Sequence, residues 1–498
     1  MNNLRLNPKN LFISAGQEKD LAGKSVRGGM ITMGSTGVMF AINMARTMLL
    51  ARLLTPADFG IIGMVTVFIS FVEMFKDAGL SMATIQKSEI NKEQISTLAW
   101  INLIITGAFG LILFAGAPII SWFYEKPELS WITMALAFSF VLGGFTIQHR
   151  ALLRRYLRFD SLALVTILST VGGVAITVVL ALWGWNYWAL VVGSIAITAF
   201  EVLLTFFFCP WIPGKMVKGS GVGNMLKFGL HLTGSSFANY FSRNADNILI
   251  GKFIGANELG LYSKAYQIFM LPIQNIRNPI NQVAIPALSS LQKDPDRYRN
   301  YFHKITDILA TISFPVAIYL YFEAGFIVNL MLGNQWMGAV PVFKLLAVGG
   351  LIQAVASQRG LVMMTMGESK RYLNWSIFYA IMAVSSFAIG IPFGIEGVAG
   401  AYAIAEYLVF IPSLFYCYRN SPVNPITFVK KLLAPLLVGL ISGLGLEMVK
   451  NFRPGDSVFY HIIYLTVFGI IFIALTLLRK DFRATATSFI NELRKKKK

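Results

Sequence analysis

The stretch RLLTPADFG at residues 52–60 recurs 200 residues later as KFIGANELG at residues 252–260. Each stretch begins with a basic residue, continues with apolar residues, and has an acidic residue two positions before its final glycine. The match continues upstream, where Gly34-Ser35-Thr36 corresponds to Gly234-Ser235-Ser236. Repeats in solenoid proteins have periods of about 20–50 residues, so this much longer register indicates duplication of a whole lobe.

The composition predicts that the lobes lie in a membrane. Of the 498 residues, 55% are hydrophobic and 13% are charged, which leaves too few polar residues to cover several soluble domains. A helix of about 20 apolar residues crosses the hydrocarbon core of a bilayer. We therefore predict an all-α polytopic membrane protein with fourteen transmembrane helices. The spans are expected at residues 25–52, 57–86, 94–120, 129–148, 160–182, 186–208, 224–251, 258–289, 299–322, 338–366, 372–391, 397–418, 426–446 and 458–478.

Basic residues are concentrated in every second connection between these spans, counted from the N-terminal segment. Cytoplasmic loops are rich in Lys and Arg, so both termini are predicted to be cytoplasmic. The same distribution explains the net charge of +19 without a nucleic-acid partner. The basic C-terminal run is either solvated or in contact with anionic membrane lipid. Cys209 and Cys417 fall at cytoplasmic span ends, where thiols stay reduced, and no disulfide, metal site or cofactor is expected.

Six spans separate the start of one copy from the start of the next, and an even number preserves orientation. The copies are therefore expected to form two pseudo-symmetric six-helix lobes around a central cavity, related by an axis along the membrane normal. The last two spans have no counterpart in the repeat. The predicted organisation is a cytoplasmic segment 1–24, an N-lobe 25–208, a linker 209–223, a C-lobe 224–419, two additional helices 426–478 and a basic cytoplasmic tail 479–498.

The connections are too short for an enzyme that acts in its loops. They span roughly 5 to 20 residues and contain no cluster of His, Asp and Ser of the kind that acid–base chemistry requires. The segment AGKS at residues 22–25 resembles the end of a phosphate-binding loop, but Glu18 stands where that motif needs glycine. We therefore expect neither an enzyme nor an ATPase.

Polar and charged side chains recur inside several spans, where they are costly and usually mark a pathway. In the first and seventh spans they follow helical spacing and form a stripe that cannot face lipid. Hydrogen bonding between helices is the alternative explanation for this stripe. The residues expected to bind substrate are Asn43, Lys76, Asn239, Arg243, Gln274, Asn275, Arg277 and Arg359; those expected to gate or couple transport are Arg46, Glu73, Asp77 and Asp246, with Asp307 and Glu406 as further candidate carboxylates.

The eighth span contains Pro272, Pro279 and Pro286. Each proline removes a backbone donor and clashes with the preceding turn, so a kinked or broken helix is expected, with a static curve as the alternative. Arg359 lies some two turns from the cytoplasmic end of the tenth span. Its guanidinium keeps its charge and matches phosphate oxygens, which predicts an anionic cargo unless the side chain snorkels to the interface.

Two stretches resemble a known family. ARLLTPADFGIIGMVTVFISFVEMFKDAGLSMATIQKSE at residues 51–89 resembles the opening hairpin of the polysaccharide transporters, the Wzx-like branch of the multidrug/oligosaccharidyl-lipid/polysaccharide exporter superfamily. NADNILIGKFIGANELGLYSKAYQIFMLPIQNIRNPINQVAIPALSSLQKDPDRYR at residues 244–299 is similar to the WzxC-like colanic acid exporters. The resemblance extends through most of residues 25–419 and is weak in the last two spans.

The resemblance implies a flippase of the bacterial inner membrane. Such a protein moves an undecaprenyl-diphosphate-linked repeat unit to the outer leaflet by alternating access, for exopolysaccharide, O-antigen or capsule biosynthesis. A polysaccharide polymerase and a chain-length regulator are the protein partners that it implies. In related lipid flippases arginines of the first, second and eighth helices line the cavity. Arg46 and Arg277 match in placement, whereas the second helix has Lys76 instead.

Two other function classes are weighed against the flippase. A drug or cation exporter of the same superfamily is expected to have a cavity dominated by carboxylates, whereas the polar positions here are rich in arginine and lysine. A membrane enzyme acting on lipid-linked sugars is expected to carry an extended periplasmic loop, which this sequence lacks. Both comparisons favour the flippase.

The 200-residue register also suggests a gate. Arg46 corresponds to Asp246, and Asp77 corresponds to Arg277. We hypothesise that the first pair closes the periplasmic side of the cavity and the second pair closes the cytoplasmic side. Pairing within one lobe, such as Arg243 with Asp246, is the alternative.

Overall fold

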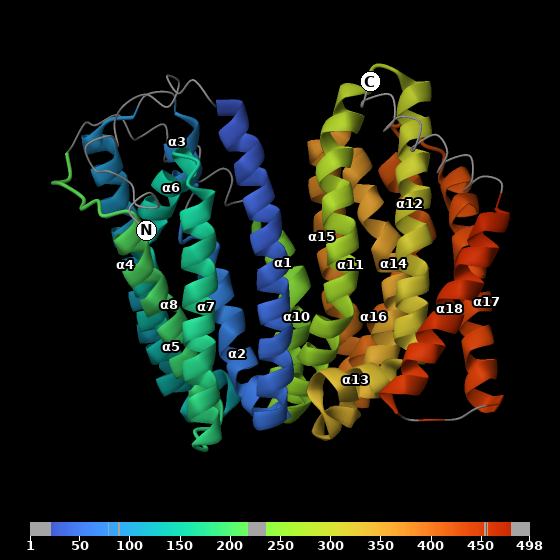
Figure 1. Ribbon diagram of the computed structural model, residues 1–498, viewed down its shortest axis with the longest axis horizontal. Coiled ribbons are helices and arrows are strands. Elements are labelled where there is room, and N and C mark those ends of the chain that lie inside the picture. Colours follow the sequence, from blue (N-terminus) through green and yellow to red (C-terminus); the bar gives the residue numbers. More distant parts are fainter. Residues whose placement is uncertain are drawn as a thin grey trace. The chain divides into compact units, whose positions relative to one another are not determined.

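The computed structural model describes residues 21–77, 79–87, 90–217, 236–452, 455 and 457–479, and every regular element in these ranges is a helix (Figure 1). The chain forms two compact units, Met1–Gly260 and Leu261–Lys498. The N-terminal segment 1–20, residues 218–235 and the tail 480–498 lie outside the described residues. The lobe boundaries inferred from the sequence therefore stay a prediction.

Ten helical segments of the described chain are long and apolar enough to cross a membrane. They confirm the all-α membrane class, and fourteen spans are compatible with them. Three long helices are not among the ten: α1 (Leu21–Leu53), α10 (Ser236–Phe253) and α11 (Ala256–Ser290). These helices carry the polar positions of the first, seventh and eighth predicted spans.

The described part of the first unit is a bundle of helices. Besides α1 and α10 it contains α2 (Pro56–Glu73), α3 (Leu80–Gln86), α4 (Lys92–Tyr124), α5 (Glu128–Gly144), α6 (Ile147–Arg155), α7 (Phe159–Leu182) and α8 (Tyr187–Phe208). Helix α7 packs against α1 and α8, α5 packs against α4 and α8, and α10 packs against α2.

The duplicated sequence forms two helix starts that contact each other. At the first, Thr55 and Asp58 form a reciprocal capping box, with Pro56 in the first turn of α2, a combination that fixes a helix N-terminus. A Cβ atom added at Gly60 would overlap the backbone carbonyl of Ala256, and one added at Gly260 would overlap that of Pro56. The repeated glycines therefore allow the two backbones to approach closely and reciprocally.

The second predicted span, residues 57–86, is not one continuous helix. Helix α2 ends at Glu73 and α3 begins at Leu80, and Gly79 between them has φ 71°. This left-handed conformation is favourable for glycine and interrupts a right-handed helix. The fourth span is likewise divided, because α5 ends at Gly144 and α6 continues to Arg155.

The second unit is built around α12 and α14. Its helices, after α11, are α12 (Pro295–Phe322), α13 (Ala324–Leu332), η4 (Asn334–Ala339), α14 (Val340–Thr365), α15 (Ser369–Gly390), η5 (Ile391–Phe393), α16 (Gly394–Tyr418), α17 (Pro425–Phe452) and α18 (Val458–Leu478). Helix α12 packs against α14 and α17, and α16 packs against α14 and α15 (Figure 1). Phe302 of α12 contacts Tyr418 and Phe428, with ring centroids 5.8 and 5.9 Å away, which anchors α16 and α17 on α12.

Helix α11 runs without a break from Ala256 to Ser290, with Pro272, Pro279 and Pro286 inside it. Of the expected kink or break, the break is therefore wrong, and the kink stays a prediction. A helix tolerates a proline when neighbouring groups compensate the lost backbone hydrogen bond, and the seven-residue spacing places all three prolines near one face.

Charged contacts join the last two helices to α12 at its C-terminal end and near its middle. The Glu323 carboxylate, fully buried, forms an ion pair with the Lys450 ammonium at 2.6 Å and contacts His461 Nδ1 at 2.6 Å. Near the middle of α12, Arg479 Nη2 donates to Asp307 Oδ1 at 2.7 Å. Helices α17 and α18, which have no counterpart in the repeat, are therefore fixed on the second unit by ion pairs as well as by apolar packing.

Candidate functional site

The predicted polar residues of α1 differ in exposure. Asn43 is exposed, whereas Arg46, three residues later, is half-buried. Positions three apart lie on neighbouring parts of one helix face. The helix therefore carries an amide and a guanidinium at neighbouring positions, and their role in a polar path stays a prediction.

Lys76 lies in the turn after α2 and reaches into the first unit. Its ammonium is 5.3 Å from the ring centroid of Phe140, and a Cβ atom added at Gly143 would overlap it. Beside this position Ser139 donates to Thr198 Oγ1 at 2.9 Å. Lys76 is therefore a half-buried cation held over an aromatic face next to hydroxyl groups of α5 and α8.

The acidic residues near Lys76 have different surroundings. The Asp77 carboxylate accepts the backbone N–H of Ser81 at 2.9 Å, so it caps the start of α3. Glu73, the last residue of α2, is exposed and acts electrostatically on Tyr240 of α10. A gate formed by Asp77 would have to release its cap on α3.

Two of the charged residues of α10, Arg243 and Asp246, were predicted as site residues and differ in exposure. Arg243 is exposed, whereas Asp246 is 5% exposed and accepts the backbone N–H of Asn247 at 2.8 Å. The side chain of Asn239 lies outside the described residues. Tyr240 fixes the helix on α2, because its hydroxyl donates to the Val67 carbonyl.

The predicted residues of α11 belong to the second unit. Gln274 and Asn275 are exposed and Arg277 is half-buried. Arg277 lies in the second unit, whereas Asp77 and Arg243 lie in the first, so its pairing with Asp77 and the joint site with Arg243 stay predictions.

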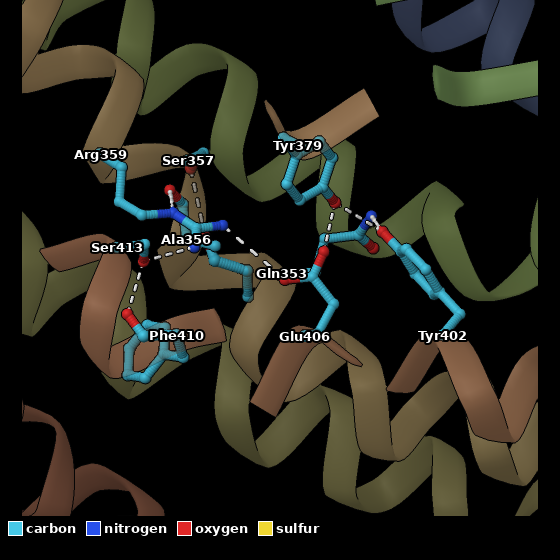
Figure 2. A network of polar contacts seen from close by, with 10 residues as sticks. Gln353, Ala356, Ser357, Arg359, Tyr379, Tyr402, Glu406, Phe410 and Ser413 are labelled. Carbon is cyan, nitrogen blue, oxygen red and sulfur yellow. Dashed lines mark hydrogen bonds and ion pairs between the residues drawn. The ribbon is translucent and has the colours of Figure 1, made fainter. Parts of the chain in front are cut away.

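Arg359 on α14 lies in the interior of the second unit, 4% exposed (Figure 2). Its Nε donates to the Ala356 carbonyl at 3.0 Å and its Nη1 donates to Ser413 Oγ at 2.7 Å. The guanidinium carbon lies 5.1 Å from the ring centroid of Trp375. These contacts contradict the alternative that Arg359 snorkels to the membrane interface, because its charge is held by protein groups.

The counter-charge of Arg359 is Glu406 on α16, which is 1% exposed. Its Oε2 is 3.7 Å from Arg359 Nη2, and its Oε1 accepts from the Tyr379 hydroxyl (Figure 2). Tyr379 also contacts the Tyr402 hydroxyl at 2.7 Å, and Gln353 donates to Tyr402 at 3.3 Å. The distance of 3.7 Å is longer than a hydrogen bond, so the pair is held by charge and by its neighbours.

The tyrosines of this network were not predicted from the sequence. Tyr402 and Glu406 are four residues apart and therefore lie on one face of α16, which is the signal that could have found them. Asp307, the other candidate carboxylate of this unit, is engaged with Arg479. The described residues contain no cluster of three His, Cys, Asp or Glu side chains that could hold a metal ion.

The sequence profile of a family described as polysaccharide biosynthesis protein matches residues 49–341, more than half of the chain. The chain belongs to this family. The matched range contains both copies of the duplicated turn and the whole of α11. Its curated relatives include transport proteins of polysaccharide biosynthesis, as the resemblance in the sequence implied.

Three curated relatives cover most of the chain. Lipopolysaccharide biosynthesis protein WzxC of Escherichia coli is 26% identical over 80% of this chain and 83% of its own length. Teichuronic acid biosynthesis protein TuaB of Bacillus subtilis is 26% identical over 75% and 78%. Succinoglycan biosynthesis transport protein ExoT of Rhizobium meliloti is 24% identical over 73% of each.

Solved structures share the fold. The lipid II flippase MurJ in an inward closed conformation matches 91% of this chain and 98% of its own, with a TM-score of 0.71 and 13% identity. An inward-facing multidrug resistance transporter of the MATE family and MOP superfamily matches 78% and 95%, with a TM-score of 0.60 and 16% identity. At this identity the likeness concerns the fold alone.

Proposed function

We propose that this chain is a flippase for lipid-linked oligosaccharides in the bacterial inner membrane, with both termini in the cytoplasm. The observation that carries the proposal is membership of the polysaccharide biosynthesis protein family, in a chain whose α10 and α11 bear arginines. Relatives named for lipopolysaccharide and succinoglycan biosynthesis, and a fold shared with a lipid II flippase, support a lipid-linked cargo.

The cargo that fits is an undecaprenyl-diphosphate-linked repeat unit. Moving its charged diphosphate through hydrocarbon unaided would cost on the order of tens of kcal/mol. Fixed cations beside a polar path lower this barrier, because guanidinium groups replace the water around the phosphate oxygens. The lipid tail can stay in the bilayer throughout, so only the head group needs such a path.

Within this proposal the exposed Arg243 and the half-buried Arg277 bind the diphosphate, and Lys76 adds a third cation. Asn43, Asn239, Gln274 and Asn275 offer amide groups to the sugars. Arg359 can reach the cargo only after its contacts with Ser413 and Glu406 open. We therefore assign it a binding role in a second conformation. A polymerase and a chain-length regulator are the proposed protein partners.

Alanine variants of these two arginines test this proposal. Arg243→Ala and Arg277→Ala are each expected to abolish surface polysaccharide while lipid-linked repeat units accumulate in the cells. Arg297→Ala is the matched control, because this arginine is also basic but lies 75% exposed at the start of α12, outside the proposed path. Normal export by both variants, with the protein present in the membrane, would contradict the basic path.

A drug exporter of the same fold is the second candidate, favoured by the likeness to a multidrug transporter. Dye efflux separates the two functions, since a flippase is expected to leave the efflux of cationic dyes unchanged.

We propose that an ion gradient or the supply of cargo drives transport. Equal flipping in proteoliposomes with and without a proton or sodium gradient would remove the ion from this scheme.

A further inference from the structure

A polar hollow lies on the second unit, at the end of the helices predicted to face the cytoplasm. It measures about 450 Å³ and lies between the first turns of α12, the end of α16 and the start of α17. Its lining includes the side chains of Arg299, Phe415, Tyr418, Arg419 and Asn424. None of these residues belongs to the proposed cargo path.

The charge of this hollow is positive. Arg419 is exposed and makes no hydrogen bond or ion pair with any described residue. Arg299 Nη2 donates to Asp296 Oδ1 on the same turn, which occupies one of the five N–H groups of the guanidinium. Lys431 of α17 adds a further positive charge, since it and Arg299 both act electrostatically on the ring of His303.

Phe415 forms an apolar part of the lining, called the apolar rim below, and is 53% exposed. Ile426, which follows the lining residue Pro425 in sequence, is 56% exposed. Both lie at helix ends where basic side chains gather, which is the arrangement of a membrane interface. A ligand that meets the arginines and the apolar rim together must combine an anionic group with hydrocarbon.

The hollow is formed by well-anchored elements. Tyr418 packs edge-on against Phe428, with ring centroids 5.5 Å apart. The Asn424 side chain accepts the backbone N–H groups of Ile426 at 2.8 Å and Thr427 at 3.2 Å, so it caps α17. Little ordering of the backbone is therefore needed when a ligand enters, which favours binding.

We propose that this α12/α16/α17 pocket binds the phosphate group of an anionic glycerophospholipid of the cytoplasmic leaflet. The Arg299 and Arg419 guanidinium groups hold the phosphate oxygens, and an acyl chain lies against Phe415. Basic pockets between transmembrane helices on this side of a membrane are suited to anionic head groups. The lipid links the last two helices to α16, a role separate from the transport of cargo.

The test measures lipid binding by the purified full chain. Native mass spectrometry counts the phosphatidylglycerol molecules that the protein retains. A titration with short-chain phosphatidylglycerol gives the affinity of the protein for this lipid. Separate titrations use phosphatidylcholine and inorganic phosphate. The variants are Arg299→Gln/Arg419→Gln and, as control, Arg297→Gln on the same turn of α12. Because the double variant loses both guanidinium groups that would hold the phosphate, it should bind phosphatidylglycerol at least about tenfold more weakly.

The control variant should bind phosphatidylglycerol with the same affinity as the natural chain. Both of these proteins should bind phosphatidylcholine more weakly than phosphatidylglycerol. Arg419→Lys, which keeps the charge but loses the planar fork, should give an intermediate affinity. Equal affinity of the double variant and the control would overturn the proposal. Saturable stabilisation by inorganic phosphate, with no preference for phosphatidylglycerol over phosphatidylcholine, would overturn the assignment to a lipid.

Discussion

Arg359 and Glu406 show how a single charged residue can be kept inside a membrane protein. Both side chains are at least 95% buried, and Ser413, Tyr379 and the Trp375 ring supply the contacts that water would otherwise provide. A buried charge that loses its counter-ion is strongly unfavourable, more so than losing the pair as a whole. Replacing one member of the pair is therefore expected to destabilise the protein more than replacing both.

Glu406→Gln is expected to lower the free energy of unfolding by about 3 kcal/mol. The amide keeps the shape of the side chain and an acceptor for Tyr379, but it leaves the Arg359 charge uncompensated. Arg359→Met in the same chain should restore part of this loss. The measurement is thermal unfolding of the purified protein in detergent.

The matched control is Glu396→Gln, which removes an exposed carboxylate from the first turn of the same helix. A melting temperature for Glu406→Gln equal to that of the control would show that Glu406 is not the counter-ion. If the double variant is stable but fails to export, the pair also serves transport.

At the scale of elements, the duplicated turns contact each other through their glycines. Gly60 of α2 faces the Ala256 carbonyl, and Gly260 of α11 faces the Pro56 carbonyl. The atoms in the way are backbone atoms at helix starts, which cannot move aside as a flexible side chain can. A methyl group at either glycine must separate the helices.

Gly60→Ala and Gly260→Ala are each expected to destabilise the protein by about 1–3 kcal/mol, as overpacking does, and to reduce export. Gly63→Ala is the control, because its Cβ atom would meet only the side chain of Leu259 at 3.4 Å. Membrane level, melting temperature and surface polysaccharide are measured for all three. Wild-type stability of Gly260→Ala would contradict the close reciprocal contact.

The elements that the sequence predicted well are those fixed by local physical chemistry. Hydropathy located α7 and α8 within a residue or two, because long apolar runs can only be buried in lipid or protein. The turn at Gly79, the added helix α13 and the unbroken α11 were missed. Each depends on neighbouring elements, which hydropathy does not report.

The candidate site was predictable only in part for the same reason. A charge inside an apolar span is conspicuous in sequence, so Arg359 and Glu406 were found. Trp375, Tyr379 and Tyr402 were not, because aromatic residues are common at membrane interfaces and nothing local places them beside an arginine. Their role follows from the packing of α14, α15 and α16 together.

At the scale of the whole molecule, the 200-residue register relates opposite charges, Arg46 of α1 and Asp246 of α10. Each lies six residues before the basic residue that opens its copy of the turn, so the two are expected at equal depth. Asp246 is buried and Arg46 is half-buried. If Arg46 and Asp246 pair in only one state of the transport cycle, the pair stabilises that state. It then shifts the equilibrium between the states by the free energy of the pair.

We predict that Arg46→Asp and Asp246→Arg each lower export, since each single variant leaves two like charges in the proposed pair. The double variant should restore most of the export. A loss of about tenfold corresponds to 1.4 kcal/mol, within the range of a partly buried ion pair.

The competing arrangement, Arg243 with Asp246 on the same helix, makes a different prediction. There the reciprocal swap Arg243→Asp/Asp246→Arg should be the one that restores export. Surface polysaccharide is measured for both double variants at equal protein level, because only one swap can be right if Asp246 has one essential partner. Rescue by neither swap would remove Asp246 from the gate and leave its burial on α10 as a matter of folding alone.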